Sequence, residues 1–522
     1  MLGGLNNILK IDNMMNDNKK VILATAPVDL FEKWVAPPLG LAYIASCLER
    51  EGYNVEIVDC HLNYFSIKKS AEIISNKKAD VVGFSAFTIN RFNVIEIIRK
   101  IKKSNPNTLI ITGGPHFSVT AEDTLRNVPE IDVVVIGEGE TTTTELLNAY
   151  FSNKPLQDIK GICFRGEGNK IIITEFRPPI KDLDSLPMPA YHLLELKKYK
   201  AFTYYFTNLT KEEKKLPSAG VVSSRGCPNS CIFCANNTEL LKTFFRKREP
   251  KKFVDEIQFL YKNYDFKIFN FWDDTFTLSK EYVLDICNEI IQRKLNIKWY
   301  VRARVNTVDG EMLEKMKEAG CIAVLYGVES GSDKILKVIK KNITTEQVKN
   351  IIMASVNMGL DVLTGFMISF PQETKDDVEK TMALVRELRS YSNKVYEIDL
   401  APTVIYPGTI IEKIAMDEGR IFPKDFSWNK KFEFQKNKQL LVSPYIPIYT
   451  QNFTLEEIMA YRLRNKLQQQ LRKSKIKLLN KAIGFIKGIR SFQDLKTLFL
   501  IYSSLKNNKN KQSTERKCHA AN

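Results

Sequence analysis

Three cysteines within eight residues are the most reactive feature of this 522-residue sequence. Cys227, Cys231 and Cys234 have the spacing C-x3-C-x2-C, with an aromatic residue, Phe233, before the last cysteine. Thiolates are the usual protein ligands of iron–sulfur clusters, and a cluster that only carries electrons is normally closed by four cysteines. Three cysteines on one short loop can hold three irons and leave the fourth open. The motif therefore predicts a [4Fe–4S] cluster that does chemistry on a bound molecule.

Two other interpretations of these cysteines compete with the cluster. A structural zinc site requires a fourth Cys or His at ligand spacing, and neither His192 nor Cys287 has that spacing. Three buried core cysteines are the second alternative. The chain has only nine cysteines in all, so three in one short loop favour a metal cluster over chance packing.

The cysteine motif resembles that of the radical S-adenosylmethionine (SAM) superfamily. The resemblance implies that SAM chelates the open iron through its amino and carboxylate groups. It also implies that the reduced cluster cleaves SAM to a 5′-deoxyadenosyl radical, with Cys227, Cys231 and Cys234 as cluster ligands and catalytic centre. A one-electron reductant such as flavodoxin or ferredoxin would then be a partner.

Strands and helices alternate after the linker, and this alternation predicts the barrel that must position the cysteine loop. Six parallel βα repeats predict a partial (β/α)6 barrel over residues 216–425, with its chemistry at the carboxyl ends of the strands. The cysteine loop follows the first strand, as that rule requires. The expected strands lie near residues 219–224, 267–271, 297–302, 321–327, 361–369 and 395–400.

Charged side chains follow the second and third barrel strands. Asp273 and Asp274 could accept hydrogen bonds from the ammonium of methionine. A helix N-cap is the alternative role for one of these two carboxylates. Arg302 and Arg304 share a strand face, and a guanidinium matches a carboxylate bidentately. We select Arg304 for the SAM carboxylate, with ion-pair roles as the alternative.

Two later strand ends match the family pattern. The resemblance implies that Glu329, with Ser330 beside it, holds the ribose hydroxyls of SAM. The stretch 365–371 resembles the family segment that packs on adenine, and this assigns Ile368 to the cofactor site. Ordinary core packing is the alternative role for Ile368.

An N-terminal Rossmann-like domain is expected over residues 20–150. Strands alternating with helices predict a parallel sheet covered on both faces. Such sheets bind ligands in the crevice beyond the carboxyl ends of their strands. The expected strands are residues 20–25, 54–59, 80–85, 109–114 and 132–137.

Small and polar residues stand at three of these strand ends, and glycine there lets a large flat ligand approach the backbone closely. Together with the sequence Pro-Pro-Leu-Gly at residues 37–40, they resemble the cobalamin-binding group of radical SAM proteins from about residue 20 to about residue 420. The resemblance implies a cobalamin cofactor. The residues assigned to it are Ser85, Gly113, Gly114, His116, Gly137, Glu138 and Gly139.

The sequence departs from many cobalamin domains at the residue that ligates cobalt. Their Asp-x-His-x-x-Gly motif after the first strand is absent, because residues 26–31 contain no histidine. His61 follows the second strand without the glycine, and we expect a surface or hinge histidine there. We therefore expect no protein histidine on cobalt, and expect His116 to line the pocket.

Composition favours a reducing, cytoplasmic compartment, since nine scattered cysteines form no disulfide scaffold. Residues 1–19 are predicted to be a disordered lead-in without the apolar core of a signal peptide. Residues 151–215 are predicted to be a linker with a small hairpin. The basic, mostly helical region 426–522 ends in a disordered tail.

The formal net charge of +17 belongs mainly to the C-terminal region. Residues 461–517 hold 16 Lys or Arg against two acidic residues. A basic amphipathic helix favours peripheral contact with a membrane surface or an anionic partner, whereas a capping helix with a solvated basic face is the alternative. We expect no nucleic acid partner, because no RNA-binding β-module is visible.

The fold class predicted from the sequence is α/β, with a cobalamin-binding domain, a radical SAM barrel and a mainly helical C-terminal region. The resemblance implies methyl transfer to an unactivated carbon of a small molecule, a lipid or tetrapyrrole among the candidates. One alternative is oxidative ring closure or rearrangement with the same cofactors. A transfer RNA methylthiotransferase lacks support because no second cysteine triad is present, and a non-enzymatic corrinoid sensor would not use the cysteine loop.

Overall fold

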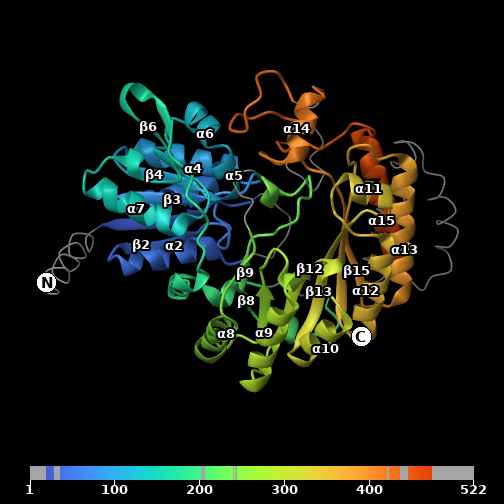
Figure 1. Cartoon of the computed structure of the whole chain (residues 1–522). Coiled ribbons are helices and arrows are strands. Elements are labelled where there is room, and N and C mark those ends of the chain that lie inside the picture. The colour runs from blue at the N-terminus through green and yellow to red at the C-terminus, as the bar shows by residue number, and fades with distance from the viewer. Residues whose placement is uncertain are drawn as a thin grey trace, which may run out of the picture.

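The computed structural model describes residues 19–28, 36–200, 206–238, 240, 244–419, 422–434 and 445–472. Figure 1 shows two α/β parts side by side, with the N-terminal sheet on the left and the second sheet with its helices on the right. The predicted lead-in, except Lys19, and the basic tail beyond residue 472 lie outside the described residues. No described helix is long and apolar enough to cross a membrane.

The N-terminal part is a seven-stranded sheet whose first five strands are parallel. These five confirm the strands predicted from the sequence. The hairpin that the sequence assigned to the linker instead pairs antiparallel with the edge of this sheet. In spatial order the strands are β2 (Asn54–Asp59), β1 (Lys20–Thr25), β3 (Val81–Ser85), β4 (Leu109–Gly113), β5 (Val133–Val135), β6 (Ile162–Arg165) and β7 (Ile171–Ile173).

Helices cover both faces of this sheet, because its strands are apolar on both sides. One core contains Leu41 of α2 and Leu146 of α7, and the other contains Ile74 of α3 and Ile95 of α4. The helices are α2 (Leu39–Arg50), α3 (Ile67–Asn76), α4 (Arg91–Ser104), α5 (Gly114–Val119), α6 (Ala121–Asn127) and α7 (Gly139–Phe151).

The second part is a six-stranded parallel sheet in sequence order, as predicted for a partial barrel. Its carboxyl ends therefore meet at one edge, where the loops carry the candidate site. A two-stranded ribbon, β9 (Ser224–Arg225) with β10 (Arg246–Lys247), leads into the cysteine loop. The six strands are β8 (Ser218–Val221), β11 (Ile268–Phe271), β12 (Lys298–Ala303), β13 (Cys321–Glu329), β14 (Asp361–Ile368) and β15 (Val395–Pro402).

Amphipathic helices pack on the outside of this sheet and close its main core. Capping boxes fix the starts of two of them: Thr344 with Gln347, and Thr374 with Asp377. The helices of this part are α8 (Pro250–Tyr264), α9 (Lys280–Gln292), α10 (Gly310–Glu318), α11 (Asp333–Val338), α12 (Thr345–Asn357), α13 (Lys375–Tyr391), α14 (Ile410–Asp417) and α15 (Leu455–Arg472).

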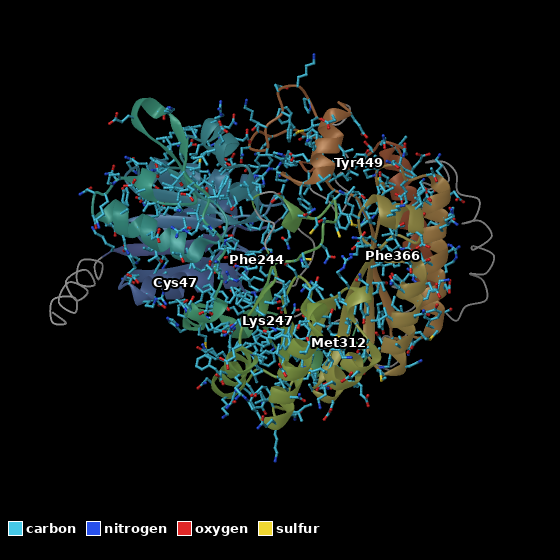
Figure 2. The ribbon with its side chains drawn as sticks, viewed as in Figure 1. Cys47, Phe244, Lys247, Met312, Phe366 and Tyr449 are labelled. Atoms are coloured by element: carbon cyan, nitrogen blue, oxygen red, sulfur yellow. The ribbon has the colours of Figure 1, made fainter. Side chains whose placement is uncertain are left out.

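The segment after α14 connects the two parts, above the barrel in Figure 1. The buried guanidinium of Arg91, on α4, donates to the backbone carbonyls of Trp428 and Tyr445 over 2.7 and 2.8 Å. Figure 2 marks Tyr449 farther along the same segment, where its backbone N–H donates to the carbonyl of Thr403. The described part of the C-terminal region is therefore an interdomain connection as well as a helix.

Candidate functional site

The three cysteines of the motif open into one cavity of about 310 Å³, which we call the thiol cavity. It lies at the carboxyl ends of the barrel strands, where a (β/α) barrel carries its chemistry. Besides Cys227, Cys231 and Cys234, its lining includes Asn229, Phe233, Asn236, Asp274, Thr275, Arg302, Arg304, Gly327, Glu329, Lys341 and Gly365.

Polar groups surround the three thiols. Asn229 donates from Nδ2 to Sγ of Cys227 over 3.2 Å, and Arg304 donates from Nη1 to Sγ of Cys231 over 3.6 Å. Burial raises the pKa of the Cys234 thiol to about 11, so a bound cation would be needed to hold it as thiolate at neutral pH. Within the described ranges, no group of three or more His, Cys, Asp or Glu side chains is placed so that it could hold a single metal ion. A cubane does not require this, because each cysteine binds a different iron.

The side chains of the two adjacent aspartates after β11 differ: one lines the thiol cavity and the other is buried in the barrel. Asp274 lines the thiol cavity and accepts from Nδ2 of Asn236 over 2.6 Å. Asp273 is fully buried and accepts from both Ser223 and Ser224, at the entry to the cysteine loop. Asp273, predicted to bind a cofactor, therefore lines neither the thiol cavity nor the second cavity described below. Its carboxylate has its hydrogen bonds inside the barrel, where it fixes the strand that leads into the loop.

The two arginines after β12 also differ. Arg304 donates to the Lys341 carbonyl, to Oδ1 of Asn306 and to the Cys231 thiol, so its guanidinium is already used. Arg302 lies with its guanidinium carbon 4.3 Å from the ring centroid of Trp272. Its buried Nη1 has no hydrogen-bond partner among the described residues. Of these two arginines, Arg302 therefore has a guanidinium nitrogen left open, whereas the residue predicted to bind the SAM carboxylate, Arg304, makes contacts within the protein.

A second cavity, of about 700 Å³, lies beyond the carboxyl ends of β1, β3, β4 and β5, and we call it the glycine cavity. Six of the seven residues that the sequence assigned to this crevice line it: Ser85, Gly113, Gly114, Gly137, Glu138 and Gly139. Gly137 has a φ of +82°, which glycine adopts without strain, and a Cβ there would meet no atom within 4 Å. A flat ligand can therefore approach this backbone.

The histidines behave differently from expectation. His116, expected to line the pocket, is fully buried behind it, with Nδ1 3.2 Å from Oγ1 of Thr88 and its ring against Trp428. His61, expected at the surface or in a hinge, lines the glycine cavity. Its Nδ1 accepts from the backbone N–H of Val28 over 3.3 Å. That contact leaves the proton of a neutral ring on Nε2, which then cannot ligate a metal.

The two cavities meet at Asp274, which lines both. Trp272 lines the glycine cavity, while Arg302, which stacks on it, lines the thiol cavity. The crevice of the N-terminal sheet and the mouth of the barrel therefore adjoin at one wall.

Comparisons with known proteins agree with this arrangement. The family model described as the B12 binding domain matches residues 31–147, and the Radical SAM superfamily model matches residues 221–385. A protein named as an uncharacterized methyltransferase from Pyrococcus horikoshii is 34% identical over 82% of this chain and 92% of its own length. The chain belongs to the cobalamin-binding radical SAM family.

Two further proteins extend the comparison. An anaerobic magnesium-protoporphyrin IX monomethyl ester cyclase from Rubrivivax gelatinosus is 30% identical over 67% of this chain, which spans 62% of that cyclase. The solved structure of the cobalamin-dependent SAM radical enzyme OxsB superposes with a TM-score of 0.68 at 17% identity, over 94% of this chain and 71% of that one. The similarity to OxsB concerns the fold alone.

As a radical SAM enzyme of this family, the chain takes a [4Fe–4S] cluster, SAM and cobalamin as cofactors, and its residues fit them. Three thiols at one cavity suit a cluster with an open iron. Glu329 lines the same cavity, where Nζ of Lys341 donates to its Oε1 over 2.9 Å. Sequence reasoning missed Lys341, because consecutive lysines after a helix usually form a solvated surface.

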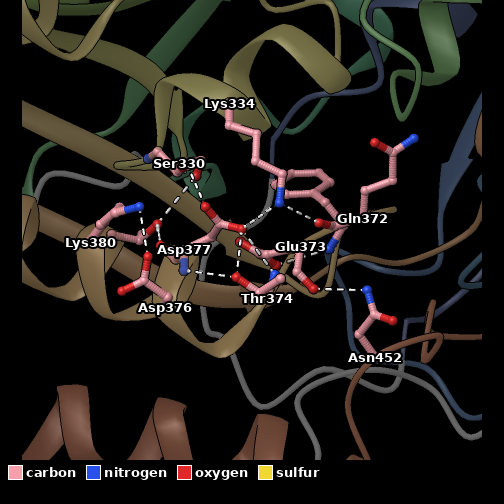
Figure 3. A network of polar contacts seen from close by, with 12 residues as sticks. Ser330, Lys334, Gln372, Glu373, Thr374, Asp376, Asp377, Lys380 and Asn452 are labelled. Atoms are coloured by element: carbon pink, nitrogen blue, oxygen red, sulfur yellow. Dashed lines mark hydrogen bonds and ion pairs between the residues drawn. The ribbon is translucent and has the colours of Figure 1, made fainter.

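The remaining predicted residues, Ser330 and Ile368, are buried behind the thiol cavity and do not line it. Figure 3 shows Ser330 in a polar network with Asp377, which accepts from Lys334 over 2.9 Å and from Thr374 over 2.8 Å. This network ties the loop after β13 to the start of α13. Ser330 therefore shapes the loop that follows Glu329, the last residue of β13, while Gly365 on β14 reaches the cavity in place of Ile368.

Proposed function

We propose that this enzyme transfers a methyl group to an unactivated carbon of a small molecule. The observation that carries the proposal is the junction of the two cavities at Asp274. A substrate held there can face SAM on one side and the corrinoid on the other. The methyltransferase name of the Pyrococcus relative, which this chain covers almost end to end, supports the same reaction.

When bound, the cluster supplies the electron that cleaves SAM, and the corrinoid supplies the methyl group. The chain would hold these groups through the residues already placed. The thiolates of Cys227, Cys231 and Cys234 would bind three irons. Asp274 would accept from the ammonium of SAM, and Nη1 of Arg302 would donate to the carboxylate of SAM.

Other residues would orient the cofactors and leave room for the substrate. Glu329 would accept from the ribose hydroxyls, with the contact from Lys341 holding its carboxylate over Gly327. The glycine strand ends would support the corrinoid. Because the backbone N–H of Val28 occupies Nδ1 of His61, we infer that this histidine, which lines the glycine cavity, does not ligate cobalt through Nδ1.

The same proposal includes an electron donor, a reducing compartment and contact with a membrane surface. A flavodoxin or ferredoxin would supply the electron, and an oxygen-sensitive cluster would require a reducing cytoplasm. The basic C-terminal region would bring the enzyme to an anionic membrane surface. Sedimentation with anionic vesicles, with and without residues 453–522, tests that contact.

The proposal is tested by anaerobic reconstitution and product mass. We expect about four irons and one corrinoid per chain, with substrate gaining the mass of one methylene. Cys231→Ala should abolish SAM cleavage and leave corrinoid binding intact, since no thiol of the motif lines the glycine cavity. A product of unchanged carbon count would favour ring closure or rearrangement. Folded protein that binds neither cofactor would refute the proposal.

A further inference from the structure

Four charged side chains meet between the cobalamin-binding domain and the barrel. Arg225 approaches Oε1 of Glu138 at 3.3 Å and Oε1 of Glu140 at 2.6 Å. Arg246 approaches Oε2 of Glu138 at 2.9 Å. The side chains of Arg246 and Glu140 are 3% and 5% exposed, so water screens these pairs little. We call these four residues the interdomain ion cluster.

The two arginines need the two glutamates. Arg225 and Arg246 are directly opposite each other in the antiparallel ribbon β9–β10, where like charges destabilise pairing. The ribbon has only two residue pairs, which is too short to be stable alone. Glu138 and Glu140, from the other domain, neutralise the opposed guanidinium groups and so hold the ribbon together.

The ion cluster lies between the two cofactor sites. Glu138, Glu140 and Arg225 line the glycine cavity. Arg225 ends β9 and is separated from the cluster ligand Cys227 by one glycine, Gly226. Figure 2 marks Lys247, the last residue of the ribbon, between the two parts of the molecule. Movement of the glutamates would therefore move the start of the cysteine loop.

The contacts of Glu138 also argue against a direct role in binding the corrinoid. Oε1 accepts from Arg225 and Arg246, while Oε2 accepts from Arg246 and from the backbone N–H of Ile180. Both oxygens are thus engaged by protein donors. Buried ion pairs add little net stability compared with apolar packing, but they can enforce one specific arrangement.

We propose that the interdomain ion cluster positions the iron–sulfur cluster relative to the corrinoid, with Glu138 and Glu140 acting as positioning residues. Each cofactor can bind its own domain without it. The ion cluster fixes the separation and orientation of the two sites, on which any reaction that uses both depends. This inference does not depend on methyl transfer being that reaction.

The separation of the two metal centres tests the proposal directly. Cob(II)alamin and the reduced cluster each carry one unpaired electron, so pulsed electron paramagnetic resonance measures the distance distribution between them in the loaded full-length enzyme. We expect one narrow component in the wild type. Glu138→Gln and Glu140→Gln should keep iron and corrinoid content but add components shifted from the wild-type distance, because each removes a charge from an opposed arginine.

A matched control is Glu145→Gln on the same helix as Glu140, where Glu145 pairs with Arg177 away from both cavities. Its distance distribution should equal that of the wild type. Unchanged distributions in both test variants would overturn the proposal, as would loss of corrinoid binding alone, which would make the glutamates cofactor ligands. Glu140→Gln leaves both Arg246 contacts intact, so it carries the test if Glu138→Gln does not fold.

Discussion

The Nη1 atom of Arg304 lies 3.6 Å from Sγ of Cys231. A hydrogen bond from a cation to a ligand sulfur stabilises the more negative, reduced cluster. Arg304→Gln should therefore lower the reduction potential of the cluster, by an amount on the order of 60 mV if the contact is worth tenfold in the one-electron equilibrium. A redox titration followed by the signal of the reduced cluster measures this shift.

Arg302→Gln is the control, because it removes the same charge from the same cavity without touching a thiol. Its potential should move much less. Equal shifts in the two variants would show that the charge of the cavity, and not the contact with sulfur, sets the potential.

We expect the same Asp→Asn substitution to have different effects at the two neighbouring aspartates, Asp274 and Asp273. Asp274→Asn removes the carboxylate that faces the thiol cavity, and a hydrogen bond to a charged group contributes about 1.5–3 kcal/mol. SAM affinity should fall roughly ten- to a hundredfold while corrinoid affinity is kept. Anaerobic equilibrium dialysis measures both affinities.

Asp273→Asn is the comparison, since that side chain is buried and accepts from Ser223 and Ser224. It should lower the melting temperature and the iron content together, with SAM affinity reduced only in proportion to lost cluster. An Asp274→Asn enzyme with full cluster content and unaltered SAM affinity would contradict the role given to Asp274.

Lys341 and Glu329 form a buried ion pair, with side chains 8% and 12% exposed. Removing one partner of such a pair leaves an uncompensated charge, at a cost of about 3–5 kcal/mol. Lys341→Met should therefore destabilise the unliganded enzyme and weaken SAM binding. Adding Glu329→Gln should recover part of the lost stability, which denaturant unfolding of Lys341→Met, Glu329→Gln and the double variant measures. Additive losses in the double variant would show that the two groups are not coupled.

Much of the architecture follows from local pattern. Each parallel strand is a short apolar run bounded by turn residues, so the strand positions and their order could be predicted. The partner of the 162–173 hairpin could not, because antiparallel pairing with β5 depends on contacts distant in sequence. The thiols and the glycine strand ends were predictable because their chemistry lies in consecutive residues.

Which of the other side chains belong to the site depends on the direction in which each one points. The sequence does not determine that direction. Asp273 and Asp274 carry the same chemistry, and only the turn after β11 decides which one faces the cavity. Arg302 and Arg304 differ in what surrounds them rather than in type. Lys341 reaches Glu329 from a loop twelve residues later, and no local pattern marks that contact.

Glu373 makes stability depend on pH. Its side chain is fully buried, Oε2 accepts from the backbone N–H groups of Ser369 and Phe370, and Oε1 has no partner among the described residues. Burial raises the pKa of this carboxyl from 4.5 to about 7, despite the two backbone hydrogen bonds. Figure 3 shows it beside the network of Asp377.

The sign of the effect follows from proton binding. With a folded-state pKa above the unfolded value, the folded enzyme binds the proton more tightly, so Glu373 reduces stability as pH rises from 4.5 to about 7. The span corresponds to roughly 3 kcal/mol. Asp377 acts below this range: although burial raises its pKa, hydrogen bonds from Ser332, Lys334 and Thr374 lower it below 3.8.

Glu373→Gln cannot ionise and should lose this pH dependence. The stability of the variant relative to the wild type should rise between pH 5 and about 7.5, because only the wild type then comes to carry a buried negative charge. Denaturant unfolding across that range measures the difference. Glu379→Gln, at a half-exposed position on helix α13, which begins two residues after Glu373, should show no such trend. A constant difference between Glu373→Gln and wild type at all pH values would mean that Glu373 titrates normally.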